Sequence, residues 1–136
     1  MVEQQTLIVI KPDGVQRKLV GAVISRFENR GFTIQKMRML TFTKAQAENF
    51  YSPHKEKPFF PGLVKFITSG PVVAVVLEGR AGVDAVAVVR SMIGATKSYE
   101  AAAGTIRGDF SLGLEDNVIH ASDSAENFKR ESKIVF

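Results

Sequence analysis

The feature that most limits the fold of this chain is the order of its strand-like and helix-like segments. Short apolar, β-branched segments indicate strands, whereas apolar residues three or four positions apart indicate helices. Strands are predicted at residues 6–11, 32–42, 72–77 and 118–119. Helices are predicted at residues 20–31, 43–50, 58–67 and 86–94, and from about residue 124 onward.

This order predicts an α+β protein with a ferredoxin-like βαββαβ antiparallel sheet, helices on one face and additional helices. A doubly wound parallel sheet is the alternative, because strands and helices alternate along the chain. Residues 32–42 alternate between apolar and polar with one slip, which is typical of an edge or half-buried strand. Residues 12–14 are predicted to form a turn. Residues 94–117 show no period, which indicates either a functional loop or an element that the pattern fails to reveal.

The length of 136 residues predicts a single domain, residues 1–136. No cysteine is present, and residues 1–5 lack the charged and apolar regions of a signal peptide. The longest apolar run, residues 72–77, is far shorter than the ~20 residues that span a bilayer. We therefore expect a soluble, cytoplasmic protein. Its net charge of +4 suits a phosphate-bearing partner, nucleic acid or nucleotide, but ordinary solvated charge explains it as well.

One of the two histidines lies in a context suited to chemistry. His120 ends the fourth predicted strand and is followed by helix-capping residues at 122–124. A histidine beside a helix N-terminus can bind phosphate or act as a base or nucleophile, because the exposed N–H groups favour anions. The alternative is a strand-end histidine with ordinary hydrogen bonds. His54, in the polar segment 52–57, is predicted to be merely exposed.

Three basic residues are candidates for binding phosphate, and each has a structural alternative. Arg107 lies between two glycines, where its guanidinium can bind phosphate in a bidentate manner or pair with Asp109. Arg90 shares a predicted helical face with apolar residues, so it requires either a carboxylate or an anionic ligand. Lys11 closes the first strand and either reaches a phosphate or is solvated. The aromatic pair at 59–60 either stacks on a base or belongs to the core.

The common nucleotide-binding loops are absent from the sequence. It contains no G-x-x-x-x-G-K-[ST] loop, no G-x-G-x-x-G loop and no protein kinase signature. Any nucleotide site must therefore have another design.

Four motifs together resemble the nucleoside diphosphate kinase family. Residues 8–15 (IVIKPDGV) resemble its first strand, and residues 55–65 (KEKPFFPGLVK) resemble its base-stacking segment. Residues 104–110 (GTIRGDF) match a family loop, and residues 117–124 (NVIHASDS) match its active-site segment. The matches occur in order, with near-constant spacing, over essentially the whole chain. The last motif is highly specific, so the resemblance favours a catalytic role for His120.

The resemblance implies a ping-pong reaction that maintains nucleoside triphosphate pools with broad base specificity. A nucleoside triphosphate gives its γ-phosphoryl group to His120, at Nδ1, and a nucleoside diphosphate then collects it. The resemblance also implies that Mg²⁺ bridges phosphate oxygens, that Ser122 and Glu131 orient the imidazole, and that Phe59 and Leu63 flank the base. The residues implied to hold the phosphates and sugar are Lys11, Tyr51, Arg90, Thr96, Arg107 and Asn117.

Three positions depart from the family pattern. Ala121 stands where many relatives have glycine, Lys97-Ser98 where Asn-Pro is common, and residues 101–103 lack the proline that commonly precedes the glycine at 104. Fewer prolines leave the unfolded chain more flexible. The resemblance implies a homo-oligomer, a hexamer rather than a tetramer, with this loop packed between subunits. We therefore expect the departures to affect assembly and not the chemistry.

Two other classes of function fit a ferredoxin-like fold. A nucleic-acid-binding module requires aromatic residues in an RNP1 pattern; residues 30–32 begin that pattern, but residues 33 and 34 break it. Nucleic acid is therefore not expected to be the main partner. A regulatory domain would leave His120, Arg90 and Arg107 as a passive anion site.

Overall fold

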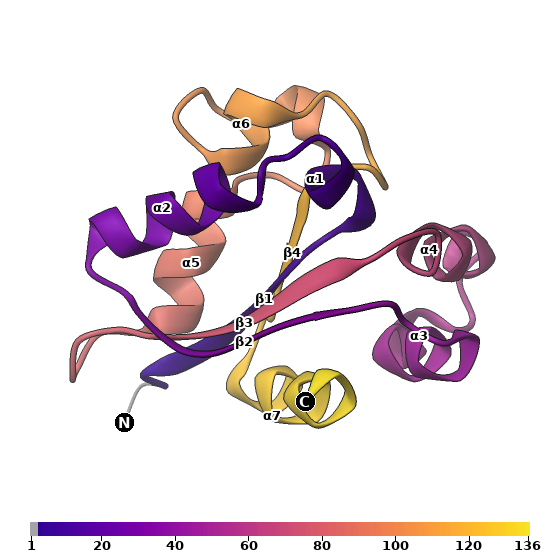
Figure 1. Cartoon of the computed structure of the whole chain (residues 1–136), viewed down its shortest axis with the longest axis horizontal. Helices are drawn as coiled ribbons and strands as arrows, with labels where there is room; N and C mark the ends of the chain where they lie inside the picture. Colours follow the sequence, from indigo (N-terminus) through magenta and orange to yellow (C-terminus); the bar gives the residue numbers. More distant parts are fainter. Residues whose placement is uncertain (1–2) are drawn as a thin grey trace.

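The computed structural model describes residues 3–136, which form a four-stranded sheet with helices packed around it (Figure 1). The strands are β1 Gln5–Ile10, β2 Thr33–Leu40, β3 Val72–Glu78 and β4 Ile119–Ala121. Their order across the sheet is β2-β3-β1-β4, and all neighbouring pairs are antiparallel. The predicted ferredoxin-like antiparallel sheet is confirmed, and the parallel alternative is wrong.

The helices follow the predicted segments, with two additional short helices. α1 replaces the predicted turn, because Pro12 at its first position supplies a helical φ. α6 lies within the segment predicted to lack structure, where the Thr105 hydroxyl caps it by accepting a hydrogen bond from Gly108 N at 3.0 Å. The bounds are α1 Pro12–Gln16, α2 Val20–Arg30, α3 Lys44–Phe50, α4 Phe60–Ile67, α5 Ala85–Ile93, α6 Ile106–Phe110 and α7 Ala125–Val135, with 3₁₀ turns at Ser52–His54 and Ser98–Glu100.

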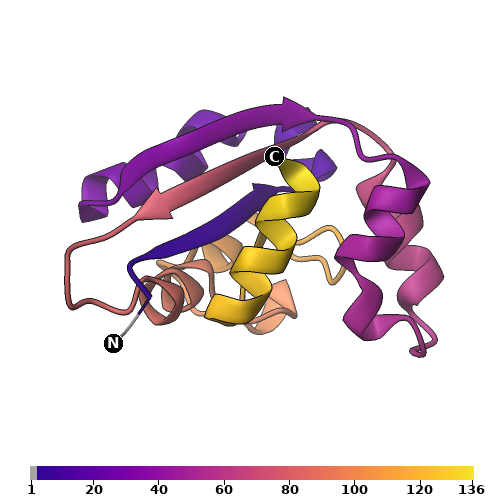
Figure 2. The same cartoon turned by 90° about the horizontal axis from the view of Figure 1, so that it is seen from below.

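Helices cover both faces of the sheet, so the prediction of helices on one face is wrong (Figures 1 and 2). α2 and α5 pack on the face that carries Ile8 and Val75, whereas α3, α4 and α7 pack on the face that carries Val9 and Ala74. β1 and β3 are therefore buried on both sides, which explains their continuous apolar sequences. Phe32, from the partial RNP1 pattern, is buried in the first of these cores. The sheet thus lacks the open aromatic platform of an RNA-binding module.

β2 is an edge strand that pairs with β3 alone. A register irregularity between Ile34 and Lys36 confirms the predicted slip. Its side chains are largely exposed, and Met37 and Met39 retain 56% and 60% of their accessible surface. Unpaired backbone groups and apolar side chains therefore lie open along this edge.

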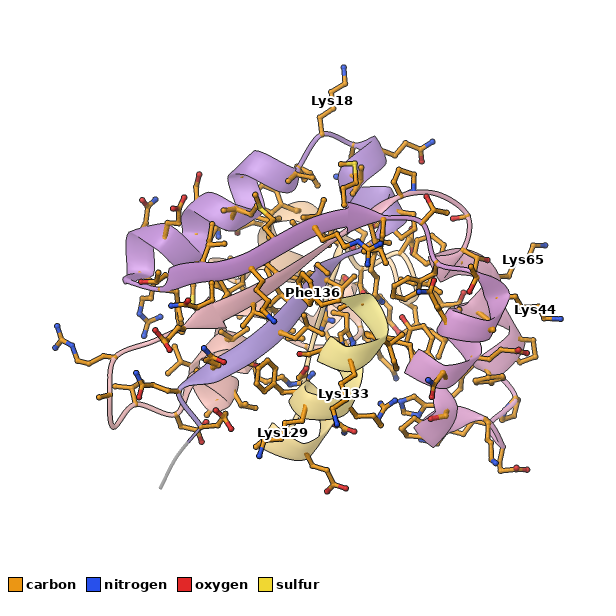
Figure 3. The ribbon with its side chains drawn as sticks, turned by 60° about the horizontal axis from the view of Figure 1, so that its bottom comes forward. Lys18, Lys44, Lys65, Lys129, Lys133 and Phe136 are labelled. Atoms are coloured by element: carbon orange, nitrogen blue, oxygen red, sulfur yellow. The ribbon has the colours of Figure 1, made fainter. Side chains whose placement is uncertain are left out.

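Much of the positive charge is solvated. The side chains of Lys44, Lys65, Lys129 and Lys133 point outward from α3, α4 and α7 (Figure 3), and these four residues are exposed. In contrast, Lys11 and Arg107 are buried. The longest helices of residues 3–136 have 11 residues, and none is long and apolar enough to cross a membrane.

The pairing of β4 with β1 positions the candidate site. His120 lies opposite Val9, and Ile119 lies opposite Ile10. Lys11 directly follows β1, so it lies close to the start of β4. The face of the sheet that carries Val9 is covered by α3 and α7, and these helices supply the other groups around the histidine.

Candidate active site

His120 is held by a buried carboxylate. Its Nε2 lies 2.9 Å from Glu131 Oε1, and the Ser122 hydroxyl donates a 2.6 Å hydrogen bond to the same oxygen. The carboxylate accepts from Nε2–H, so Nδ1 keeps its lone pair. This arrangement leaves the second ring nitrogen available for nucleophilic attack.

Glu131 lies on the buried face of α7 with Phe128 and is 4% exposed. Burial acts to raise the pKa of Glu131, but interactions with His120, Ser122 and Arg130 outweigh burial and lower its pKa below the usual value. Glu131 therefore remains an anion that can stabilise positive charge developing on the imidazole.

Two aromatic rings pack near the imidazole and restrict its orientation. The Phe50 ring centroid lies 4.8 Å from that of His120, and the Tyr51 centroid lies 6.5 Å away, both in edge-to-face orientation. Both residues belong to the end of α3, which a capping box at Thr43 begins. Burial raises the pKa of Tyr51, so its hydroxyl stays neutral and can donate a hydrogen bond.

Arg107 is a buried cation beside the histidine. It is 4% exposed, and its guanidinium donates to Gly94 O at 3.0 Å and to Ile119 O at 2.6 Å. Its Nε is buried and has no hydrogen-bond partner among residues 3–136. Burial, followed by the charge of Arg90, lowers the pKa of Arg107 to about 10, so it remains charged at neutral pH. An anionic ligand would compensate this buried charge.

The structural alternatives proposed for the two arginines are wrong. Asp109 pairs with Arg26 at 2.7 Å and not with Arg107. Arg90 is exposed rather than buried in an apolar stripe, and it donates to Ala121 O at 3.2 Å without a carboxylate partner among the described residues. Both guanidinium groups line one cavity.

Lys11 and Asn117 form a polar bridge between the end of β1 and the start of β4. Lys11 Nζ donates to Asn117 Oδ1 at 2.8 Å and to Glu115 O at 3.2 Å. The Asn117 amide donates to Thr96 O at 2.9 Å. Burial, followed by the charge of Arg107, lowers the pKa of Lys11 to about 8. Three of the predicted phosphate-binding residues are therefore linked directly.

The part of the cavity lining that comes from residues 53–63 is largely apolar. Phe59 is 46% exposed, and Leu63 lies one turn further along in α4. His54 also belongs to this part, with its ring centroid 5.7 Å from that of Phe59 and its Nδ1 buried without a partner among the described residues. The prediction that His54 is merely exposed is wrong, because the 3₁₀ turn after α3 directs it toward the cavity.

One cavity of about 340 Å³ connects these apolar residues with His120. The predicted site residues that line it are Lys11, Tyr51, Phe59, Leu63, Arg90, Thr96, Arg107, Asn117, His120 and Glu131. Ser122 is fully buried and reaches the site through Glu131.

Other residues of the cavity were not predicted. Asn127 donates to Asp123 at 2.6 Å, and Arg130 donates to the carbonyl oxygens of Asn49 and Phe50 while its Nη2 lies 3.6 Å from Glu131 Oε2. Asn127, Arg130 and Glu131 are three and four residues apart on α7, and this spacing is the sequence signal that could have indicated them.

The acidic side chains of the site are already engaged. Glu131 accepts from His120 and Ser122, and Asp123 accepts from Asn127. Within residues 3–136 no three histidine, aspartate or glutamate side chains are grouped as metal ligands. The donor set therefore suits a cation that arrives on an anionic ligand better than one held by the protein alone.

A histidine with a free ring nitrogen, a buried carboxylate and several cations around one cavity define the class of protein as a phosphotransferase on a ferredoxin-like fold. Comparison with known proteins identifies the family. The model of the family described as nucleoside diphosphate kinase matches residues 4–136. The chain belongs to the nucleoside diphosphate kinase family, whose members pass a phosphoryl group between nucleotides through a phosphohistidine.

Close relatives include the nucleoside diphosphate kinases of Staphylothermus marinus and Sulfolobus acidocaldarius. The first is 53% identical over 133 residues, covering 98% of this chain and 92% of the relative. The second is 54% identical over 136 residues, covering 100% and 92%.

Solved structures agree with this assignment. The enzyme of Halobacterium salinarum in complex with CDP has a TM-score of 0.92 and 43% identity, covering 98% of this chain and 88% of that one. The Aquifex aeolicus nucleoside diphosphate kinase also has a TM-score of 0.92 and 43% identity, covering 98% and 94%.

Proposed function

We propose that His120 is the residue that carries the phosphoryl group in this member of the family. The observation that carries this proposal is the contact between His120 Nε2 and the buried Glu131 carboxylate, in a cavity that Lys11, Arg90 and Arg107 also line. Phosphoryl transfer depends mainly on positioning and charge neutralisation, and this arrangement supplies both.

The reaction proceeds in two matching halves. The Nδ1 lone pair of His120 attacks the γ-phosphorus of a nucleoside triphosphate, the bond from phosphorus to the β,γ-bridging oxygen breaks, and the nucleoside diphosphate leaves. A terminal β-phosphate oxygen of a second nucleoside diphosphate then attacks the same phosphorus, and the phosphorus–nitrogen bond breaks. Glu131, itself held by Ser122, stabilises the imidazole in both halves.

The other site residues bind and orient the nucleotide. Lys11, Arg90 and Arg107 neutralise phosphate charge, and the neutral Tyr51 hydroxyl donates a hydrogen bond. Asn117 and Thr96 contact the phosphates and sugar, and Phe59 and Leu63 flank the base. Bound together with the nucleotide, Mg²⁺ would supply further neutralisation of phosphate charge, and phosphate oxygens would provide most of its ligands because Glu131 and Asp123 are already engaged.

Labelling with γ-labelled ATP tests the assignment of His120. The wild-type protein should take up one acid-labile label per chain and release it to a nucleoside diphosphate. The His120→Ala and His120→Gln variants should take up none; the glutamine can still donate to Glu131, which protects the fold. The His54→Ala variant should still take up one label per chain, even if it is phosphorylated more slowly. Label that persists in both His120 variants would mean that another residue carries the phosphoryl group.

The base site supports broad nucleotide specificity. The side chains of Phe59 and Leu63 offer no hydrogen bond, and stacking tolerates every base. ATP, GTP, CTP and UTP are expected to differ by less than ~30-fold in kcat/KM, because strong discrimination requires buried polar groups. His54 is the polar side chain at this end of the cavity that could oppose this expectation. Rates of His120 phosphorylation with each triphosphate provide the test.

We also propose that residues 1–136 act as one catalytic domain within a cytoplasmic homo-oligomer, where nucleotides are available. A hexamer is favoured over a tetramer. The open β2 edge with Met37 and Met39 supports assembly, and so do the exposed Leu112 (84%) and Leu114 (50%) in the long segment before β4. Apolar side chains so exposed are typical of association surfaces.

A further inference from the structure

A strained turn lies between Asn117 and His120. Val118 has a φ of 74°, and Ile119 N donates to Asn117 O at 2.8 Å, which closes a three-residue γ-turn. A positive φ is unfavourable for a β-branched residue. Val118 is fully buried, so the strain is maintained by its surroundings. The turn sets the orientation of Asn117 relative to the start of β4.

Both backbone groups of Val118 are bound by the segment that follows β1. Its N–H donates to Asp13 Oδ2 at 3.0 Å, and its carbonyl oxygen accepts from Lys11 N at 2.8 Å. The second Asp13 oxygen, Oδ1, is buried and has no hydrogen-bond partner among residues 3–136. A single Asp13 oxygen therefore provides the side-chain hydrogen bond to the turn.

α1 approaches the turn so closely that only a hydrogen fits at Gly14. A Cβ at this position would lie 2.8 Å from Ile10 Cγ2 and 3.0 Å from Val118 O. The close approach of Gly14 keeps the Asp13 carboxylate against Val118. The segment 12–14, predicted from the sequence to be only a turn, thus packs against the γ-turn.

We propose that Asp13 is a positioning residue that holds the γ-turn at Val118, so that Asn117 and His120 are presented together to the nucleotide. This inference rests on the proposed role of His120. The turn links the two groups directly: Asn117 precedes Val118 and contacts Lys11 and Thr96, while His120 follows Ile119 in β4. Asp13 acts through the backbone and does not touch the reacting atoms.

Three substitutions separate the hydrogen bond of Asp13 from its charge. Asp13→Asn keeps an acceptor oxygen without the charge, Asp13→Glu keeps the charge but displaces the acceptor, and Asp13→Ala removes both. We expect the Asn variant to phosphorylate His120 within ~3-fold of the wild-type rate. The Glu and Ala variants should lose ~10- to 100-fold in kcat, with a smaller change in KM, because the base end of the cavity is unaltered. Asp116→Ala is the matched control, since Asp116 is an exposed carboxylate near Lys11 that does not bind the turn.

Two further readouts keep the proposal falsifiable if the Ala variant folds poorly. The Asp13 charge acts to raise the pKa of Lys11, so the Asn variant should lose activity at a lower pH than the wild type. The Val118 amide should exchange its hydrogen slowly in the wild type and the Asn variant and faster in the Glu variant. Equal loss in the Asn and Ala variants, or none in any variant, would overturn the proposal. Failure of the wild type to take up label would instead contradict the role of His120.

Discussion

Arg107 and Arg90 line the same cavity but differ in burial, and this difference predicts different consequences of their loss. Arg107→Ala should lower kcat/KM by ~10²-fold or more, which corresponds to ~3 kcal/mol of transition-state stabilisation. It should also lower the Tm by several degrees, because Gly94 O and Ile119 O each lose a buried donor. Arg90→Ala should cause a similar kinetic loss with little change in Tm, because Arg90 is exposed.

Steady-state kinetics and thermal unfolding on the same preparations test this contrast. Arg80→Ala is a suitable control, because Arg80 is exposed in the loop after β3 and does not line the site. An Arg107→Ala variant that unfolds earlier but keeps full activity per folded molecule would show that Arg107 has only a structural role.

The lowered pKa of Lys11 predicts a pH dependence. Burial is the main cause of the decrease to about 8, so the free enzyme loses this positive charge as the pH rises through about 8. Phosphate binding then weakens, and kcat/KM should fall above pH 8. kcat should fall less, because a bound phosphate favours the charged lysine. A Lys11→Arg variant should lack the alkaline decrease; if the decrease persists, another group titrates.

The same pKa shift makes the free energy of unfolding rise with pH, whereas kcat/KM falls. The folded-state pKa of about 8 lies below the ordinary value of 10.5, so the unfolded chain binds more protons between these values. The contribution of Lys11 to the free energy of unfolding is therefore lowest below pH 8 and rises between pH 8 and pH 10.5. Urea unfolding of the wild type and of Lys11→Met should show the wild type gaining relative stability as the pH rises across that range.

The segment between α5 and β4 is held by specific backbone contacts, and these decide where proline is tolerated. Ser98 N donates to Gly113 O at 3.0 Å, whereas no hydrogen bond from Ala103 N is found among residues 3–136. Proline removes an N–H but also reduces the entropy of the unfolded chain. Ala103→Pro should therefore stabilise the protein by ~0.4–1 kcal/mol, and Ser98→Pro should not.

Urea unfolding of the two proline variants, with Ala103→Ser as a control, measures this difference. An Ala103→Pro variant less stable than the wild type would mean that the backbone at 103 does not suit proline. Kinetic constants should change little in the Ala103→Pro variant, because Ala103 does not line the cavity.

At the scale of the whole molecule, the edge strand β2 has the more exposed side chains of the two edge strands within residues 3–136, and this predicts where the chains associate. Replacing Met37 and Met39 together by lysine introduces charge on β2 and should reduce the mass of the oligomer in solution. Light scattering or sedimentation measures that mass. Lys44→Ala on α3 is the control and should leave it unchanged. An unchanged mass in the double variant would mean that β2 is not the contact surface.

Local patterns in the sequence determined most of the elements, though not α1 and α6, and most of the site. Helical periodicity and apolar runs are properties of neighbouring residues. The sequence therefore predicts α2, α3, α5 and the strands without any knowledge of the fold. The residues of the site could be predicted because four motifs keep their order and spacing. Every predicted site residue lines the cavity or, like Ser122, lies directly behind it.

Only the tertiary structure decided which polar side chains are buried and which groups they bind. Lys11 and Asn117 are 106 positions apart and meet only because β4 pairs with β1. Arg90 is exposed although it shares a helical face with apolar residues, and Arg107 is buried although it lies in a loop segment between two glycines. The strained turn at Val118 has no local signal, because its conformation is imposed by Asp13 and the packing of α1. Such features depend on contacts between distant segments, which no local pattern of residues encodes.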